Sequence, residues 1–262
     1  MPGAALMVML MLAGAAGAVA ATPATAAGEA VGLEEVTVSA RRVSERLQDV
    51  PMSVTSLSGE MLERQSAQTV FDVQATVPAL RVRYGSGDQS TLIVSLRGPT
   101  HNRQDVTVDP AVGIYVDDVV YAHPVGTNAD LLDIASVEVL QGPQGTLFGR
   151  NTIGGALVIK TKDPQHDVTS MVVGAGAGSY GHQKLSGVLN LPLTDRLALR
   201  VAAQTAGNSG LQRELVTNTR LLKSDVDSGR VKLDFRLNDA ISVLAGFEYL
   251  DVNGRSPAMA IM

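Results

Sequence analysis

The stretch SVEVLQGPQGTLFGRNTIGGALVIKTK, residues 136–162, decides the fold of this chain. It joins two short apolar runs, residues 137–140 and 156–159, through a loop rich in glycine. Short apolar runs bounded by glycines are typical of buried strands with tight turns, and glycine lets the backbone approach closely where side chains would clash. The loop carries no catalytic group. The segment therefore predicts a tightly packed, enclosed element and not an active site.

Three more motifs precede this stretch: LEEVTVSARR at residues 33–42, LQDVPMSVTSLSGEMLERQ at residues 47–65, and SLRG at residues 95–98. In this order, the four segments resemble the TonB box and then the opening, middle and closing signatures of the plug domain in TonB-dependent outer-membrane receptors. One residue departs from the family pattern, because Gln141 stands where the family usually has arginine. A plug-to-barrel salt bridge from this position is therefore not expected.

The resemblance implies an α+β plug domain followed by antiparallel transmembrane β-barrel strands, in the bacterial outer membrane, with the plug and TonB box facing the periplasm. It implies gated uptake of a scarce solute, such as an iron-siderophore, cobalamin or an oligosaccharide, with TonB and outer-membrane lipid as partners. The implied TonB box is Glu35, Val36, Thr37, Val38 and Ser39, a short alternating strand suited to strand addition. An ordinary first strand of the plug sheet is the alternative. The implied plug–barrel contacts are Arg97, Glu138, Arg150 and Lys160, and solvated surface charges are the alternative.

The composition excludes several functions. With 262 residues, of which 45% are hydrophobic, the chain can bury a core. A net charge of -5 argues against a nucleic-acid partner, which needs a basic surface. The chain has no cysteine, so disulfides and thiolate sites are excluded, and its four histidines lack metal-site spacing. No catalytic residue, metal or cofactor is expected.

Four regions are expected along the chain: a signal peptide (1–26), a linker with the TonB box (27–46), the plug domain (47–163), and the start of a transmembrane β-barrel (164–262). The first region is apolar and uncharged, which is typical of an export signal, although a membrane anchor is the alternative. In the plug, Ser58 is expected to cap one helix, and Thr69 with Asp72 a second. Strands are expected at residues 80–84, 92–97 and 113–117, and a third helix at 129–134.

After Pro164 the apolar residues alternate with polar ones. Leu197, Leu199, Val201 and Ala203 share one face, opposite Arg196, Arg200 and Gln204. Residues 231–237 repeat the pattern, with Val231, Leu233, Phe235 and Leu237 opposite Lys232, Asp234 and Arg236. Tight turns at residues 194–195 and 238–239, with a long polar loop at 206–227, favour a transmembrane barrel over a soluble sandwich. About five strands are expected, too few to close a barrel. The sequence thus favours an N-terminal fragment, with a different fold of the last 95 residues as the alternative.

Topology alone suggests that ligand contacts lie at the plug apices, residues 85–90 and 100–109, and in the loop 206–227. The candidates in the plug are Asp88, Gln89, His101, Asn102 and Arg103. Asp117-Asp118 resembles the family's Tyr-Val-Asp-Gly strand end and predicts acid–base chemistry only if its pKa is raised in an enclosed cleft. The glycines 176, 178 and 181 match a dinucleotide fingerprint in letters, but no helix is expected after them. Other readings are a soluble periplasmic or surface ligand-binding module, a non-transporting remnant and, least well, an envelope hydrolase.

Overall fold

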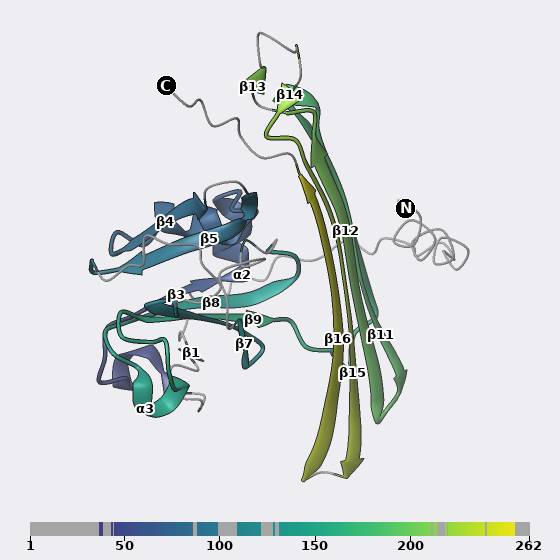
Figure 1. Ribbon diagram of the computed structural model, residues 1–262. Helices are drawn as coiled ribbons and strands as arrows, with labels where there is room; N and C mark the ends of the chain where they lie inside the picture. Colours follow the sequence, from purple (N-terminus) through teal and green to yellow (C-terminus); the bar gives the residue numbers. More distant parts are fainter. Residues whose placement is uncertain are drawn as a thin grey trace, which may run out of the picture.

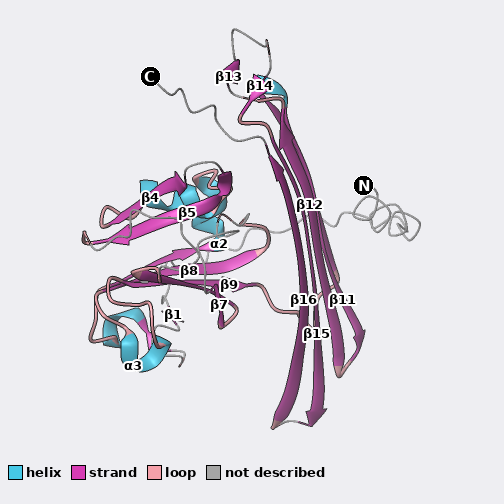
Figure 2. Ribbon diagram, viewed as in Figure 1, coloured by secondary structure: helices cyan, strands magenta, loops and turns pink. Residues whose placement is uncertain are grey.

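The computed structural model describes residues 37–38, 43, 45–85, 88–98, 109–121, 128, 131–210, 212–213, 218, 220–238 and 240–254. These residues form a five-stranded mixed sheet with short helices, a second five-stranded sheet of much longer strands, and three two-stranded pairs. Figure 1 shows the mixed sheet beside one face of the long sheet. Figure 2 shows that the helices belong mainly to the first part. The expected signal peptide, residues 1–26, lies outside the described residues.

Residues 136–162 form the centre of the mixed sheet. The strand order of this sheet is β3 (Val54–Ser58), β8 (Ile134–Gln141), β9 (Gly155–Thr161), β6 (Val112–Val116) and β7 (Val119–Tyr121). Of its four strand pairs, only β6 with β9 is parallel. Val137, Val139 and Leu157 are fully buried, as predicted. Glycine is required at position 155, where φ is 141° and an added Cβ would lie 2.1 Å from the carbonyl oxygen of Leu140. The loop between β8 and β9 contains the short helix α3 (Gly145–Phe148).

The predicted helix starts are confirmed. Helix α2 (Gly59–Arg64) begins after Ser58, whose hydroxyl accepts a hydrogen bond of 3.3 Å from the backbone nitrogen of Met61. Thr69 and Asp72 form a reciprocal capping box at the start of η3 (Val70–Ala75), which is a 3₁₀ helix. The predicted strands at 80–84 and 92–97 correspond to the hairpin β4 (Leu80–Gly85) and β5 (Asp88–Leu96).

The helix expected at residues 129–134 is wrong in its described part. Leu132 and Asp133 form a turn, and β8 already begins at Ile134. Asp133 has a φ of 56°, in the left-handed region, which a right-handed helix does not tolerate. The backbone nitrogen of Leu131 instead donates to the carbonyl of Gln68, 2.8 Å away. Tertiary contacts thus determine the backbone conformation of this segment.

The long sheet contains the five strands expected after Pro164, each antiparallel to its neighbour: β10 (Ser170–Gly178), β11 (His182–Thr194), β12 (Leu197–Asn208), β15 (Ser224–Asn238) and β16 (Ile241–Gly254). The 3₁₀ turn η4 (Ser179–Gly181) joins β10 to β11, so no helix follows the glycine fingerprint. The first tight turn comes one residue later than predicted, at 195–196, because Thr194 still belongs to β11. Asn238 likewise still belongs to its strand, β15. The long loop carries a small hairpin, β13 (Gln212–Arg213) and β14 (Arg220–Leu221).

The two faces of the long sheet differ as the alternation predicts. On the face away from the mixed sheet, Val231, Leu233, Phe235 and Leu237 are exposed. On the face toward it, Arg200 and Lys232 are buried, with only 9% and 5% of their surface exposed. Apolar side chains outward and polar side chains inward are typical of transmembrane barrel strands. Within the described part of the chain, no helix is long and apolar enough to cross a bilayer.

Candidate functional site

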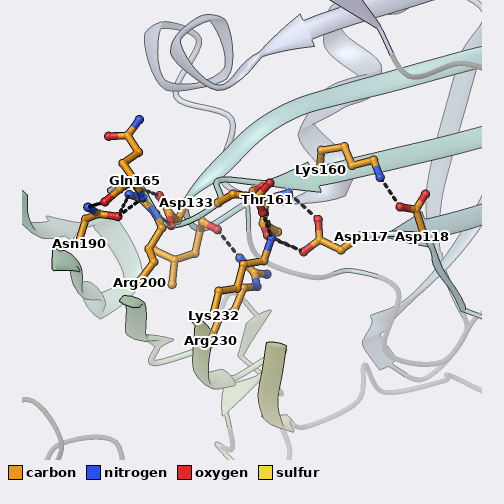
Figure 3. A network of polar contacts seen from close by, with 12 residues as sticks. Asp117, Asp118, Asp133, Lys160, Thr161, Gln165, Asn190, Arg200, Arg230 and Lys232 are labelled. Atoms are coloured by element: carbon orange, nitrogen blue, oxygen red, sulfur yellow. Dashed lines mark hydrogen bonds and ion pairs between the residues drawn. The ribbon is translucent and has the colours of Figure 1, made fainter. Parts of the chain in front are cut away.

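The mixed sheet is held against the inward face of the long sheet by a polar junction (Figure 3). Asp133, in the turn before β8, accepts two hydrogen bonds from the guanidinium of Arg200 on β12, both 2.6 Å long. Both side chains are buried, with 5% and 10% of their surface exposed. A bidentate arginine–carboxylate pair fixes orientation as well as distance. This pair therefore defines how the mixed sheet sits on the long sheet.

Lys232 on β15 makes the second contact of the junction. Its ammonium lies 2.9 Å from Oδ2 of Asp117, 2.8 Å from Oδ1 of Asp163 and 3.4 Å from the carbonyl oxygen of Thr161. Three acceptors match the three donors of a lysine ammonium, so the buried charge is satisfied. Lys232 thus connects the ends of β6 and β9 to the long sheet.

Asp117 starts the turn between β6 and β7, in which Asp117 and Asp118 both have positive φ, 45° and 69°. Its carboxylate also accepts hydrogen bonds from the backbone nitrogen and the hydroxyl of Thr161, 2.9 and 2.5 Å long. Burial would raise the pKa of Asp117, but these hydrogen bonds and Lys232 outweigh it and lower the pKa. Acid–base chemistry was predicted here only for a raised pKa, so the condition for it is not met.

The connection between the two sheets is also fastened to the inward face. The side chain of Asn190 on β11 accepts from the backbone nitrogen of Gln165 and donates to its carbonyl, both at 2.9 Å. His166 lies 2.8 Å from Asp234 on β15 and is almost fully buried. Arg230 donates to the carbonyl of Leu132, 3.0 Å away. The contacts of Asn190 and His166 hold the connection on β11 and β15, whereas Arg230 holds the turn before β8.

Only part of this junction was visible in the sequence. The alternation placed Arg200 and Lys232 on the inward face but did not reveal their partners, Asp133, Asp117 and Asp163. The partners lie in turns and at a strand end of the mixed sheet, and the Arg200–Asp133 pair spans 67 positions of sequence. One signal in the sequence could have indicated these partners. A lysine or arginine on the inward face of a predicted strand becomes buried, and it then needs an anionic group from another element.

The four residues predicted to connect plug and barrel have these positions. Arg97 donates to the side-chain oxygen of Gln141, 3.0 Å away, and Lys160 pairs with Asp118 at 2.6 Å. Arg150 lies 3.9 Å from Asp109, with both side chains exposed. These described partners all belong to the mixed sheet and its loops. Glu138 is buried, with 2% of its surface exposed. Their role against a barrel wall stays a prediction.

Of the predicted TonB box, the structure describes Thr37 and Val38, whereas Glu35, Val36 and Ser39 lie outside the described residues. The two residues form β1 (Thr37–Val38), antiparallel to β2 (Glu45–Arg46), which the 3₁₀ turn η2 (Leu47–Asp49) follows. The side chain of Val38 is 2% exposed and packs in a hydrophobic cluster. The buried members of this cluster are Val38, Val50, Tyr115, Leu140, Phe148, Ala156 and Val158.

Most of the predicted ligand contacts lie outside the described residues. His101, Asn102 and Arg103 are outside the described residues, and of Asp88 and Gln89 only the backbone is described, in β5. Clefts lie between the two sheets in the part of the chain that the structure describes. One, of about 880 Å³, lies between the β6–β7 hairpin and strands β15 and β16, and includes Asp117, Lys160 and Lys232. A smaller one, of about 150 Å³, lies between η3 and the loop ends of β11 and β12.

The sequence pattern of the family described as TonB-dependent Receptor Plug Domain matches residues 46–156. The chain carries the plug domain of a TonB-dependent receptor. Residues 46–156 hold the mixed sheet except residues 157–161 of β9, so the plug domain is the part that the polar junction fastens to the inward face of the long sheet.

Relatives agree with this assignment. The chain is 28% identical over 214 residues to the iron-regulated outer membrane virulence protein of Vibrio cholerae, covering 78% of this chain and 32% of the relative. It is 31% identical over 148 residues to the vitamin B12 transporter BtuB of Vibrio vulnificus, covering 56% and 23%. The chain thus spans about a third, or less, of the length of these relatives.

Solved structures show the same fold. The ferric yersiniabactin uptake receptor FyuA of Yersinia pestis superimposes with a TM-score of 0.66 at 29% identity, over 72% of this chain and 29% of the receptor. The ferripyoverdine receptor of Pseudomonas aeruginosa superimposes with a TM-score of 0.70 at 19% identity, over 83% and 27%. The matches extend beyond the plug, so the long sheet corresponds to antiparallel transmembrane barrel strands, which here form an open sheet.

Proposed function

We propose that this chain is the plug-bearing part of an outer-membrane receptor that takes up a scarce solute by TonB-dependent gating. The solute belongs to the class of iron-siderophores, cobalamin or oligosaccharides. Two relatives support the first two members of that class, since one is named a ferric yersiniabactin uptake receptor and another a vitamin B12 transporter. The plug domain closes the passage, and TonB supplies the force that rearranges it.

One observation carries this proposal: the plug is fastened to the inward face of the strands by the ion pairs of two buried cations, at one end of β8 and β9. Arg200 and Lys232 hold Asp133 and Asp163, which flank the two strands. Val38 lies in the hydrophobic cluster that contains Leu140, and Leu140 is near the opposite end of β8. A pull on the N-terminal segment would thus act on the plug away from its fastened end.

The pairing of Thr37 and Val38 with β2 has a consequence for TonB binding. Strand addition needs free backbone groups on the added segment, but Thr37 and Val38 already pair with Glu45 and Arg46. We expect Thr37 and Val38 to leave β2 when the TonB box pairs with an edge strand of TonB, because this frees the backbone groups that face β2. The pairing is short, two residues on each strand, so its release is expected to be easy.

The test is the binding of a purified periplasmic domain of TonB to the detergent-solubilised chain. The variant Val38→Pro removes a backbone donor and fixes φ, which blocks strand addition. It is expected to lose binding, whereas the control Val43→Pro, at an exposed position outside the box, retains it. Equal binding by both variants would contradict the assignment of residues 35–39 as the TonB box.

The alternative function, a soluble ligand-binding module, fits the long sheet less well than a membrane receptor does. A soluble sandwich would cover its apolar face with a second sheet. Here Met171, Val231, Phe235 and Phe247 are exposed, with exposed fractions of 40% to 69%, on strands of one sheet. An apolar face of this extent is expected to contact lipid.

A further inference from the structure

The connection between the two sheets, residues 162–169, is bound to different partners at its two ends. The backbone nitrogen of Lys162 donates to the carbonyl of Asp133 in the plug, 3.0 Å away. From Gln165 to Val168, the connection bonds instead to β11 and β15 of the long sheet. Residues 162–169 are all described, and none of them belongs to a hydrophobic cluster of the plug. The boundary between the plug-bound part and the sheet-bound part therefore lies at residues 163–164.

Asn190 of β11 holds the sheet-bound part (Figure 3), and none of its surface is exposed. Its Oδ1 accepts from the backbone nitrogen of Gln165 at 2.9 Å and from Nη1 of Arg200 at 3.4 Å. Its Nδ2 donates to the carbonyls of Gln165 and Val168, at 2.9 and 2.5 Å. An asparagine amide has two donors and two acceptor lone pairs, so these four bonds use all of them. Aspartate lacks the donors and leucine lacks both kinds of group, so neither can replace the amide here.

The same amide also supports the anchor of the plug. Asn190 and Arg200 are opposite each other in the register of β11 and β12. The guanidinium uses Nε and Nη2 for Asp133, and Nη1 for Asn190. If Asp133 moved away with the plug, Arg200 would still have Asn190 as a partner, and its guanidinium would keep its orientation.

Two contacts on β15 also hold the connection without the plug. The side chain of His166 is only 3% exposed and lies 2.8 Å from Asp234. Lys232 binds Asp163 of the connection as well as Asp117 of the plug. Lys232 would therefore keep one carboxylate partner if the plug moved away.

We propose that Asn190 is a positioning residue for the gating movement of the plug. It keeps residues 165–168 on the long sheet while the plug rearranges, and it keeps Arg200 oriented so that Asp133 can bind again afterwards. The plug moves relative to Pro164, whose ring fixes φ and removes a backbone donor, whereas the connection beyond Pro164 stays on the sheet. The inference rests on the proposed uptake function and deepens it, since it states which part of the chain moves during gating and which part does not.

The test measures two distances in the full chain in detergent by double electron–electron resonance between nitroxide labels. Both distances end at a label on Val243→Cys of β16. The plug distance starts at Ile153→Cys, and the connection distance starts at Val168→Cys. All three side chains are exposed, so the labels fit without repacking of a core. Both distance distributions are expected to be narrow in the otherwise unchanged chain.

The first variant combines Asp117→Asn with Asp133→Asn. It removes the carboxylates with which the plug holds Lys232 and Arg200, while asparagine tolerates the positive φ of both positions. The plug distance is expected to lose its narrow distribution, whereas the connection distance keeps it.

The second variant, Asn190→Leu, is expected to have the opposite effect. The connection distance broadens, while the plug distance stays narrow because Asp133 keeps both hydrogen bonds from Arg200. Asn190→Asp keeps the acceptors and loses the two donors, so it should broaden the connection distance in a chain that stays polar at this position. The matched control is Asn253→Leu, which replaces an exposed asparagine of the same sheet that donates to Asp251 at 3.0 Å. It should leave both distributions narrow.

Broadening of both distances in the Asp117→Asn, Asp133→Asn variant would overturn the proposal, because the connection would then move with the plug. A connection distance that stays narrow in both Asn190 variants would overturn the role of Asn190. Broadening of both distances in the Asn190 variants would overturn it as well, since a purely structural role predicts that result. Binding of the TonB domain depends on neither distance, so failure of this inference and failure of the proposed function are distinguishable.

Discussion

Arg200 of strand β12 and Asp133 of the plug form a bidentate pair in which both nitrogen–oxygen distances are 2.6 Å. Both residues are nearly fully buried where the two sheets meet. Breaking a buried ion pair by removal of one partner leaves an uncompensated charge and is strongly destabilising. The attachment of the plug to the long sheet is therefore sensitive to single substitutions at these two positions.

Arg200→Met is expected to lower the free energy of unfolding by about 3–5 kcal/mol, because the carboxylate of Asp133 stays buried without its partner. The measurement is urea denaturation in detergent. Arg236→Met is the matched control, since Arg236 is exposed and has no ion pair among the described residues, and its effect should stay within about 0.5 kcal/mol. Adding Asp133→Asn to Arg200→Met should restore much of the loss, because asparagine carries no charge and tolerates the left-handed backbone. Equal stability of the two single variants would contradict the anchoring role.

The pH dependence of stability is expected to follow Asp117. Its pKa is lower in the folded chain than in the unfolded chain, where it is about 3.9. The stabilisation is therefore complete above about pH 4 and is lost as the pH falls through the lowered pKa. Asp117→Asn should reduce this acid-side loss in urea titrations between neutral and low pH. Asp225→Asn, which removes an exposed carboxylate, should leave the profile as it is.

Asp118→Gly tests the turn between β6 and β7. Asp118 has a φ of 69°, a conformation that costs a residue with a Cβ about 1 kcal/mol more than glycine. The substitution also removes the partly exposed pair with Lys160, which contributes up to about 1 kcal/mol. The two effects oppose each other, so thermal or urea unfolding should change by less than about 1 kcal/mol. Asp117→Gly should be clearly more destabilising, because Lys232 and Thr161 lose their partner.

Leu233→Arg and Leu244→Arg compare the two faces of the long sheet. Leu233 is exposed on the outward face, whereas Leu244 lines the cleft between the sheet and the plug. An arginine toward lipid costs about 2–4 kcal/mol near the bilayer midplane, while an inward arginine faces a polar interior. Leu233→Arg should thus reduce the fraction of chain inserted into liposomes, measured by flotation. A larger loss for Leu244→Arg would reverse the assignment of the faces.

The sequence predicted the elements whose signals are local. The hydroxyl of Ser58 and the Thr69–Asp72 box mark helix starts within a few residues, and the alternation around Arg200 assigns it to the inward face. The turn at Asp133 was not predictable, because apolar residues nearby fit a helix and only contacts with Gln68 and Arg200 exclude it. Likewise, the sequence shows only that Gln141 lacks the arginine charge, because its hydrogen bond from Arg97 joins residues 44 positions apart.

The position of the plug on a transmembrane sheet is tested by a nitroxide scan along β15 in liposomes. Because the chain has no cysteine, the scan has no background labelling. Single cysteines at residues 230–237 would carry the label, and power saturation would compare contact with oxygen and with a water-soluble relaxant. Odd positions are expected to contact lipid-dissolved oxygen, and positions 230, 232 and 234, which face the plug and its connection, to be shielded from it. Equal contact with the water-soluble relaxant at odd and even positions would contradict a plug seated on a transmembrane sheet.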